Sequence, residues 1–335
     1  MATGSSRKLD GKSILITGGT GSFGKRFVKA VLERYNPRRL IIYSRDELKQ
    51  YEMQQTFNPE KHDCLRYFLG DVRDLDRLNM ALRGVDVVVH AAALKQVPAA
   101  EYNPTECIKT NVLGAENLVM ASISAKVEKV IALSTDKAAS PINLYGASKL
   151  AADKIFVAGN RLSGIDGTVF SCVRYGNVVG SRGSVIPFFQ KLIDEGADKL
   201  PITDPRMTRF WITLQQGVDF VLSSFDIMKG GEIFVPKIPS MKITDLAAAM
   251  APNLTLETVG IRPGEKLHEI MVTEDDARYT VQLKDRYIIE PYFTHALGLK
   301  IFEESTPVPE DFRYSSDKNP EWLTTDQLKA MIAEP

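Results

Sequence analysis

Two pairs of side chains near the middle of the chain have the types and spacing that proton transfer requires. Tyr145 and Lys149 stand four positions apart, so in a helix they lie on one face. An ammonium close to a phenol favours the phenolate, which lets the tyrosine accept a proton near neutral pH. Just upstream, Asp136 and Lys137 place an acid beside an amine. A Tyr-x-x-x-Lys spacing alone also fits a surface tyrosine packed on a lysine stem, so its meaning depends on the elements around it.

A glycine-rich turn near the N-terminus is typical of a dinucleotide phosphate site. Gly18, Gly21 and Gly24 follow the apolar run Ser13–Thr17 and open the amphipathic segment Ser22–Arg34. Glycine permits a tight turn and close approach to a pyrophosphate, and a helix N-terminus offers it unpaired N–H groups. A plain glycine turn is the alternative, but the strand–turn–helix order favours the phosphate site. The predicted contacts are Gly18, Thr20, Gly21, Ser22, Phe23 and Gly24.

The end of the second apolar run bears on the choice between NAD and NADP. It reads Tyr43-Ser44-Arg45-Asp46. A carboxylate at this strand end usually binds the ribose 2′-hydroxyl of NAD, whereas an arginine accommodates the 2′-phosphate of NADP. Ser44 and Arg45 therefore favour NADP, and Asp46, one position later, leaves NAD as the alternative. Asp71, after the third apolar run, is expected at the adenine edge or as a helix cap, and the two roles are compatible.

The first half of the chain alternates apolar runs with amphipathic segments, which predicts a parallel sheet covered by helices on both faces. Right-handed crossovers then give a doubly wound α/β fold of the Rossmann type. The predicted strands are Ser13–Thr17, Leu40–Tyr43, Leu65–Leu69, Val85–His90, Val130–Ser134 and Thr168–Val173, and the predicted helices include Ser22–Arg34, Thr105–Ser124 and Leu144–Leu162. Ligands bind outside the carboxyl ends of such strands, which is where Asp136 and Lys137 are placed. His90, inside an apolar strand, is expected to be a core residue.

After about Tyr175 the alternation of apolar runs and amphipathic segments ends, and prolines interrupt shorter segments. We predict a dinucleotide-binding domain over residues 1–175, with later returns of the chain near 210–235, and a smaller substrate-binding lobe with a C-terminal tail over residues 176–335. Phe210 and Trp211 are expected to pack where the two parts meet. The tail from about Thr306 is rich in Pro, Glu and Asp, and we expect it to pack only loosely.

Composition excludes several classes of protein. The chain has 335 residues, with 42 basic and 42 acidic side chains and a formal net charge of zero, which argues against a nucleic-acid partner. No stretch approaches the ~18 apolar residues of a membrane span, and the N-terminus lacks a signal-type apolar run. We therefore expect a cytoplasmic protein without a membrane partner. Three separated cysteines and four scattered histidines predict neither a disulfide framework nor a metal site.

Longer sequence runs carry a resemblance to a known superfamily. They are His90–Lys95, Arg174–Val185, Met207–Trp211, Phe234–Lys237 and Gly260–Lys266, all within residues 12–291. With the glycine turn and Tyr145, they resemble the extended short-chain dehydrogenases/reductases. The likeness is closest to the configuration-inverting UDP-N-acetylglucosamine 4,6-dehydratases that open pseudaminic acid synthesis for flagellin glycosylation. Related retaining enzymes carry methionine where Tyr145 stands, which favours the inverting branch.

The resemblance implies a hydro-lyase cycle with NADP as cofactor. NADP takes hydride from C-4 of UDP-N-acetylglucosamine while Tyr145 takes the hydroxyl proton, and the hydride later returns to C-6. Lys137 removes the C-5 proton and a protonated Asp136 assists the departing C-6 hydroxyl, so C-5 is inverted. Thr135 and Lys149 complete the implied catalytic set. These roles require a raised pKa for Asp136 and a lowered pKa for Lys137; a salt-bridged loop is the alternative interpretation of that pair.

The resemblance also implies two sets of binding residues. Besides the glycine turn, Tyr145 and Lys149, the cofactor set is Ser44, Arg45, Asp46, Glu47, Leu48, Lys49, Asp71, Val72, Ala91, Lys95 and Val178. The substrate set is Lys95, Leu133, Ser134, Lys137, Asn177, Arg182, Gly183, Ser184, Val185, Lys199, Arg209, Arg262 and Glu265. Arginine suits this site because its guanidinium fork matches the oxygens of a diphosphate.

Three alternatives remain beside the pseudaminic acid dehydratase. They are a nucleotide-sugar 4-epimerase or reductase of the same fold, the capsule-sugar branch of the same dehydratases, and a non-catalytic dinucleotide-binding protein. The helices predicted at Thr105–Ser124 and Leu144–Leu162 carry apolar residues over a wide arc. With the resemblance, they favour a homo-oligomer, either a dimer or a hexamer.

Overall fold

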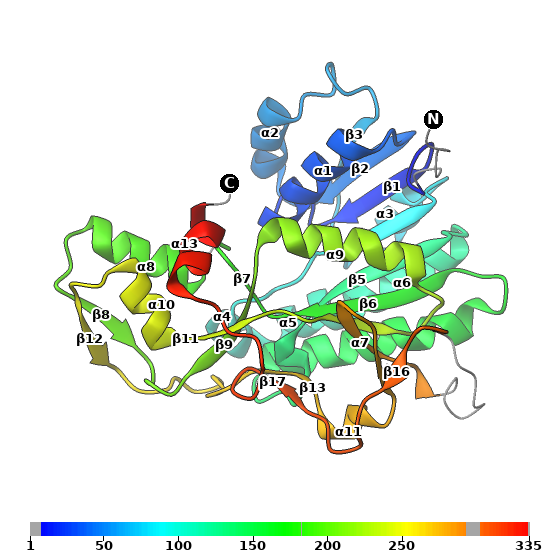
Figure 1. Ribbon diagram of the computed structural model, residues 1–335. Coiled ribbons are helices and arrows are strands. Elements are labelled where there is room, and N and C mark those ends of the chain that lie inside the picture. Colours follow the sequence, from blue (N-terminus) through cyan, green and yellow to red (C-terminus); the bar gives the residue numbers. More distant parts are fainter. Residues whose placement is uncertain (1–7, 182, 293–301, 334–335) are drawn as a thin grey trace, which may run out of the picture.

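The computed structural model describes residues 8–181, 183–292 and 302–333 (Figure 1). Within these residues the main sheet has ten strands, seven of them parallel. In spatial order they are β3 (Leu65–Leu69), β2 (Arg39–Ser44), β1 (Ser13–Thr17), β4 (Val87–His90), β5 (Lys129–Thr135), β6 (Val169–Tyr175) and β10 (Ile233–Pro236), then the antiparallel β15 (Arg286–Ile289), β14 (Thr280–Gln282) and β16 (Thr306–Pro307). The predicted doubly wound fold is confirmed.

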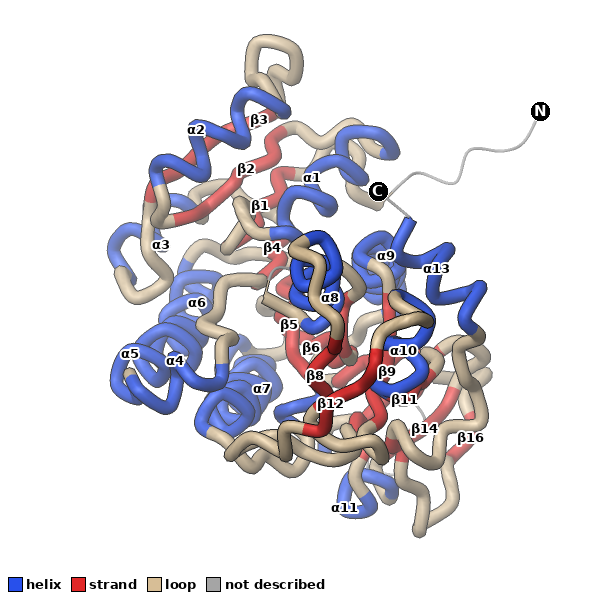
Figure 2. The backbone as a smooth tube through the Cα atoms, turned by 90° about the vertical axis from the view of Figure 1, so that its left-hand side faces the viewer, coloured by secondary structure: helices blue, strands red, loops and turns tan. Residues whose placement is uncertain are grey.

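Helices cover both faces of this sheet, as its strands require, because β1 and β4 are buried along their whole length. Figure 2 shows the strands between two helical layers, with α1 packed beside α9 on one side and α6 beside α7 on the other. The helices of this half are α1 (Ser22–Arg34), α2 (Glu47–Thr56), α3 (Leu75–Ala81), α4 (Val97–Tyr102), α5 (Pro104–Ile108), α6 (Gly114–Ser124), α7 (Leu144–Ser163) and α9 (Leu214–Ile227).

The helical segment expected at Thr105–Ser124 is confirmed as an unbroken run of α5, a π-helical turn and α6, and only the π-helical geometry of the middle turn was not predicted. Residues Lys109–Leu113 form a π-helical turn between α5 and α6. Within this turn the buried Asn111 bonds the N–H and the carbonyl of Leu94, at 2.8 and 2.9 Å, and the hydroxyl of Ser148 at 2.9 Å. The π-helical turn thus fixes the position of the segment after β4. The spacing of apolar residues does not predict this contact.

A second hydrophobic core lies in a smaller lobe, seen at the left of Figure 1. Its elements are β7 (Asn177–Val178), α8 (Val185–Asp194), β8 (Lys199–Ile202), β9 (Thr208–Ile212), β11 (Ser240–Lys242), α10 (Ile243–Met250), β12 (Thr255–Thr258) and α13 (Thr325–Ala333). Strand β9 connects the two cores, because Phe210 packs into the large one and Trp211 into the small one. Both side chains are fully buried, which confirms the packing role predicted for them.

The described part of the C-terminal tail is well packed, so the expectation of loose packing was wrong. Tyr314 and Ser315 form β17, which pairs with β13 (Ile270–Val272), and Leu328 of α13 lies in the small core. The buried Asn319 amide donates to the carbonyl of Ile238 at 2.8 Å. Polar composition misleads here because polar residues of the tail, such as Ser316 and Asn319, are buried together with Tyr314 and Leu328.

Among the residues described, none of the helices combines the length and apolar character that crossing a membrane would need.

Candidate active site

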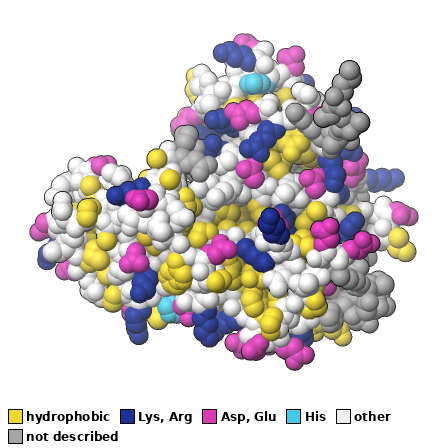
Figure 3. Space-filling view, in the orientation of Figure 1, with side chains coloured by type: hydrophobic (Ala, Val, Ile, Leu, Met, Phe, Trp, Pro, Cys, Tyr) yellow, Lys and Arg dark blue, Asp and Glu magenta, His cyan; other side chains and the backbone are white. Residues whose placement is uncertain are grey.

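A cleft of about 1200 Å³ lies between the carboxyl ends of the central strands and the smaller lobe. Its walls include the glycine turn after β1, the ends of β2, β4, β5 and β6, the start of α7, and the loop Arg262–Lys266. Figure 3 shows hydrophobic side chains together with lysine and arginine where the smaller lobe meets the larger body. This is the edge of the sheet at which doubly wound folds bind ligands.

The cleft brings together most of the residues predicted from the sequence. Those that line it are Gly18, Thr20, Gly21, Ser22, Phe23, Gly24, Ser44, Arg45, Asp46, Lys49, Asp71, Val72, Ala91, Lys95, Leu133, Ser134, Thr135, Lys137, Tyr145, Lys149, Asn177, Val178, Gly183, Ser184, Val185, Arg209, Arg262 and Glu265. Four predicted residues lie outside this set, Asp136, Glu47, Leu48 and Lys199. Asp136 is fully buried behind Thr135 and Lys137, and Lys199 is exposed at the start of β8. Arg182 falls outside the described residues.

The glycine turn has the geometry of a phosphate cradle. Gly18 has φ +65°, and a Cβ there would lie 2.8–2.9 Å from the backbone of Ala91 and Ala92. The turn therefore needs glycine both for its conformation and for its closeness to the neighbouring strand. Gly21 is the N-cap of α1 and supplies no capping side chain. The first N–H groups of α1 consequently remain suited to an anion such as a dinucleotide pyrophosphate.

Past the end of β2, the two residues that bear on cofactor choice have different surroundings. The carboxylate of Asp46 caps α2 by accepting from Lys49 N at 3.0 Å, and it pairs with Lys49 Nζ at 2.7 Å. These contacts lower the pKa of Asp46. The guanidinium of Arg45 is about half exposed and lies 3.5 Å from Asp71 Oδ2. Asp46 is thus engaged with its own helix, while Arg45 remains exposed at the cleft.

The acid–amine pair stands directly after β5, in the short 3-10 turn Asp136–Ala138. Asp136 is fully buried, and its Oδ1 accepts from Thr135 Oγ1 at 2.8 Å and from Lys137 Nζ at 3.0 Å. Its other oxygen, Oδ2, has no hydrogen-bond partner among the described residues. A buried carboxyl oxygen without a partner is an open hydrogen-bond position that a donor on a ligand can satisfy.

Tyr145 is in the first turn of α7, where Asn143 caps the helix by accepting from Gly146 N at 2.7 Å. Burial raises the pKa of Tyr145 to about 12, against the opposing positive charge of Lys137 and a hydrogen bond with Thr135. The expected activation by Lys149 is therefore not what these side chains provide. Lys137 is the cation that acts on the phenol, and burial lowers the pKa of Lys149 itself.

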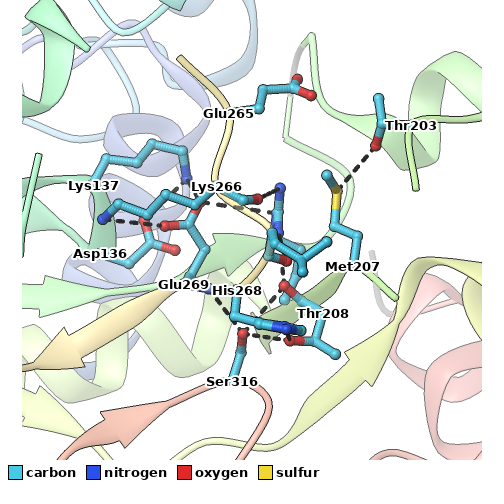
Figure 4. A network of polar contacts seen from close by, with 12 residues as sticks. Asp136, Lys137, Thr203, Met207, Thr208, Glu265, Lys266, His268, Glu269 and Ser316 are labelled. Atoms are coloured by element: carbon cyan, nitrogen blue, oxygen red, sulfur yellow. Dashed lines mark hydrogen bonds and ion pairs between the residues drawn. The ribbon is translucent and has the colours of Figure 1, made fainter. Parts of the chain in front are cut away.

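Lys137 also differs from its predicted state. Burial lowers its pKa, but the negative charges of Asp136 and Glu269 outweigh burial, and the net pKa is raised. A lowered pKa was what the predicted role of Lys137 as a base requires, and that prediction did not include Glu269. Sequence reasoning missed this residue, although it lies only three positions beyond the run Gly260–Lys266. Glu269 lines the cleft, and Figure 4 shows it among the cationic side chains.

On the substrate side, unpartnered polar atoms indicate where a ligand would bind. Asn177 Oδ1 and Glu265 Oε2 are buried and have no hydrogen-bond partner among the described residues. Arg262 is exposed and lies 4.0 Å from Glu265. Arg209 is buried, and its guanidinium donates to the carbonyls of Thr208, Lys266 and Leu267 at 2.7–3.1 Å. Arg209 is therefore fixed in place before any ligand binds.

His90 is a core residue, as predicted. It is buried at the end of β4, its Nδ1 lies 2.8 Å from Thr17 Oγ1, and its ring lies against Phe156. Burial lowers its pKa to about 3, so the imidazole is neutral. Across residues 8–181, 183–292 and 302–333, no group of three or more His, Cys, Asp or Glu side chains is arranged to hold a metal ion.

Known proteins resemble this chain over nearly its whole length. The family model described as "Polysaccharide biosynthesis protein" matches residues 14–291. A Campylobacter jejuni protein (serotype O:23/36, strain 81-176) named UDP-N-acetylglucosamine 4,6-dehydratase (inverting) is 58% identical over 334 residues, covering 97% of this chain and 98% of that protein. A Rickettsia massiliae protein named UDP-glucose 4-epimerase is 45% identical over 335 residues, 96% of this chain and 95% of its own.

A solved structure supports the same relationship. The structure of Pen from Bacillus thuringiensis has a TM-score of 0.88 and 37% sequence identity to this chain, with 97% of this chain and 98% of that one covered.

Proposed function

The chain belongs to the polysaccharide biosynthesis protein family of the extended short-chain dehydrogenases/reductases, and on that premise we propose that it is a UDP-N-acetylglucosamine 4,6-dehydratase that inverts C-5. The product is a UDP-2-acetamido-2,6-dideoxy-4-keto-L-hexose. One observation carries this proposal: Lys137 lines the cleft with Tyr145, and its amine is hydrogen-bonded to the buried carboxylate of Asp136 behind it. Oxidation at C-4 needs a hydride acceptor and a tyrosine base, whereas loss of water needs a further acid and base.

The cleft also has the features that NADP requires. The cradle around Gly18 suits a pyrophosphate, and the exposed Arg45 suits a 2′-phosphate because Asp46 is engaged with Lys49. When bound, the nicotinamide accepts a hydride from the sugar and later returns it. NAD is the alternative, and it would require Asp46 to leave the N-terminus of α2.

The side chains then divide the proton transfers between them. Tyr145 takes the proton of the C-4 hydroxyl at Oη, and the resulting ketone acidifies C-5. Lys137 first passes its ammonium proton to Asp136, to which its Nζ is hydrogen-bonded. The neutral amine then accepts the C-5 proton at Nζ, and Asp136 gives its proton to the C-6 hydroxyl, which departs as water. Hydride addition at C-6 and protonation of C-5 from the opposite face complete the product. Glu265 Oε2 and Asn177 Oδ1 are free to bind polar groups of the UDP-sugar.

A single incubation tests this function. Purified protein is mixed with UDP-N-acetylglucosamine in deuterated water without added NADP, and the product is examined by NMR and mass spectrometry. We expect loss of one water and one deuteron at an inverted C-5. A C-4 epimer without deuterium would support instead the epimerase alternative, which the name of the Rickettsia relative favours.

We extend the proposal to assembly and biological role. Large apolar side chains, Met120 of α6 and Leu162 of α7, are exposed on the helices expected to associate, which supports a homo-oligomer. A cytoplasmic location and a first step of pseudaminic acid synthesis, for flagellin or other surface glycans, follow from the resemblance. The capsule-sugar branch is the alternative pathway, and identification of the sugar that accumulates in a deletion strain distinguishes the two.

A further inference from the structure

Glu269 is a buried carboxylate that the chemistry above does not use. It directly precedes β13, and its side chain is only 3% exposed. Its N–H donates to Ser316 Oγ at 2.9 Å, and its carbonyl accepts from Ser316 N at 2.9 Å. The backbone of Glu269 is thus fixed on both sides by the C-terminal tail.

The carboxylate faces cations from three segments of the chain. Its Oε1 lies 3.4 Å from Lys137 Nζ and 3.9 Å from Arg209 Nε, and its Oε2 lies 3.8 Å from Lys266 Nζ (Figure 4). Oε2 has no hydrogen-bond partner among the described residues. Burying a carboxylate is costly, and proximity to several cations offsets that cost.

Lys137 therefore lies between two buried carboxylates. Its Nζ is 3.0 Å from Asp136 on one side and 3.4 Å from Glu269 on the other. Among the described residues, Arg209 and Lys266 are further cations of this cluster, and the phenol of Tyr145 and the guanidinium of Arg174 are titratable or charged groups near it. An ammonium held between two carboxylates keeps its proton more strongly than one held by a single carboxylate.

We propose that Glu269 is a positioning residue, whose carboxylate holds the Lys137 amine against Asp136 and sets the pH range in which that amine can act as a base. That Lys137 takes the C-5 proton of the sugar rests on the proposed function. Transfer of one proton from Lys137 Nζ to Asp136 would produce the neutral amine and the protonated acid together. Glu269 opposes this transfer, because its negative charge favours the ammonium form of Lys137.

The sign of the effect follows from the charges. In Glu269→Gln one of the two carboxylates facing Lys137 becomes neutral, while Asp136, Arg209 and Lys266 keep their charges. The pKa of Lys137 must then fall. We expect the limb of the pH–rate profile that reports Lys137 to move to lower pH by about one unit, as removal of one nearby opposite charge does. The plateau rate falls as well, since the amine loses one of its two partners.

Competitive labelling gives a readout that does not depend on turnover. The full-length protein is treated with trace acetic anhydride across a pH series, and modification of Lys137 is measured by mass spectrometry. The midpoint for Lys137 is expected about one pH unit lower in Glu269→Gln than in the unaltered protein. In Glu269→Asp the shorter side chain withdraws the carboxylate, so a smaller shift in the same direction is expected.

A matched control separates charge from packing. Ser316→Ala removes the hydroxyl that fixes the backbone of Glu269 but changes no charge, so the Lys137 midpoint is expected to stay where it is. Affinity for UDP should change less than about threefold in Glu269→Gln, because Arg209 is held by three backbone carbonyls.

Coincident Lys137 midpoints in Glu269→Gln and the unaltered protein would overturn the proposal. So would the absence of any shift in Glu269→Asp, should the amide variant fail to fold. If the unaltered protein converts no UDP-N-acetylglucosamine at any pH, the proposed function fails instead. The labelling midpoints then still decide whether Glu269 controls Lys137.

Discussion

The two walls of the cleft are built in different ways. On the cofactor side, the shape comes from the backbone: a positive φ at Gly18, an uncapped helix N-terminus and parallel strand ends. On the substrate side, it comes from buried charges that distant segments bring together, namely Lys137, Arg209 and Glu269. A backbone cradle forms with its local strand–turn–helix unit, whereas a charge cluster exists only after the whole chain has folded. The backbone cradle therefore determines which class of ligand binds, and the charge cluster determines which reaction is catalysed.

The largest expected effect concerns the charged wall. Asp136→Asn and Lys137→Met should each lower dehydration by about a thousandfold, because each removes one partner of general acid–base catalysis. Product formation from UDP-N-acetylglucosamine, followed by NMR, measures the loss. The exposed Lys191→Met on α8 is the control and should retain normal turnover. Full dehydratase activity in both active-site variants would exclude the proposed roles.

The backbone wall should respond to a methyl group alone. In Gly18→Ala the new Cβ meets the backbone of Ala91 and Ala92, and strain of about 1–3 kcal/mol should weaken NADP binding roughly tenfold to a hundredfold. Gly11→Ala is a matched control, since Gly11 has φ +71° but no atom within 4 Å of the added Cβ. Calorimetric titration with NADP compares the two. Equal losses in both variants would show that conformation, rather than contact with the strand, is what matters.

Burial is the largest influence on the pKa of His90 within the sheet and keeps its side chain neutral, whereas opposite charges at the charged wall keep Lys137 protonated. His90 is neutral in the fold, with its pKa lowered by burial to about 3, against ~6.5 in the unfolded chain. Because the pKa of His90 is lower in the fold, its contribution to the free energy of unfolding is complete above pH ~6.5 and is lost as the pH falls toward 3. Between pH 6.5 and 5 the free energy of unfolding should decrease by about 2 kcal/mol.

Urea unfolding at the two pH values measures this dependence. His90→Gln keeps a polar group beside Thr17 without the titration, so its unfolding free energy should change much less across the same interval. His62→Gln is the control, because His62 lies outside the core. A pH dependence that persists unchanged in His90→Gln would assign the effect to other groups.

The smallest effect concerns cofactor choice at the exposed edge of the backbone wall. Arg45→Ala should weaken NADP binding about tenfold, the loss of one charged hydrogen bond, and leave NAD binding nearly unchanged. The guanidinium is about half exposed, which limits the effect. Calorimetry with both cofactors measures the ratio of affinities. A parallel loss for NAD would mean that Arg45 contacts a part that the two cofactors share.

Sequence reasoning was accurate where a feature is local. The parallel strands could be predicted because strands buried on both faces are continuously apolar, and the boundaries differ mainly at ends such as Val87, which the prediction placed at Val85. Asp136, Lys137 and Tyr145 could be placed together because they follow one strand and open the next helix. Glu269 could not, because the pairing of β13 with the C-terminal β17 is needed to bring it there.

The errors have a related cause. The charges of Asp136 and Glu269 reverse the effect of burial on the Lys137 pKa, and no spacing along the chain reports the second carboxylate. The π-helical turn at Lys109–Leu113 and the packed tail also depend on partners far away, such as Leu94 and Ile238. Local patterns predict elements, and tertiary contacts decide the state of the side chains between them.

Strand β9 limits how the molecule can open. Two consecutive residues, Phe210 and Trp211, are each completely enclosed, one in either half. Because the two rings are neighbours in one strand, any rotation of the smaller lobe about this peptide must keep each ring in its own core. Replacing either ring by a smaller side chain should therefore loosen the junction of the two lobes, at a cost of several kcal/mol in stability.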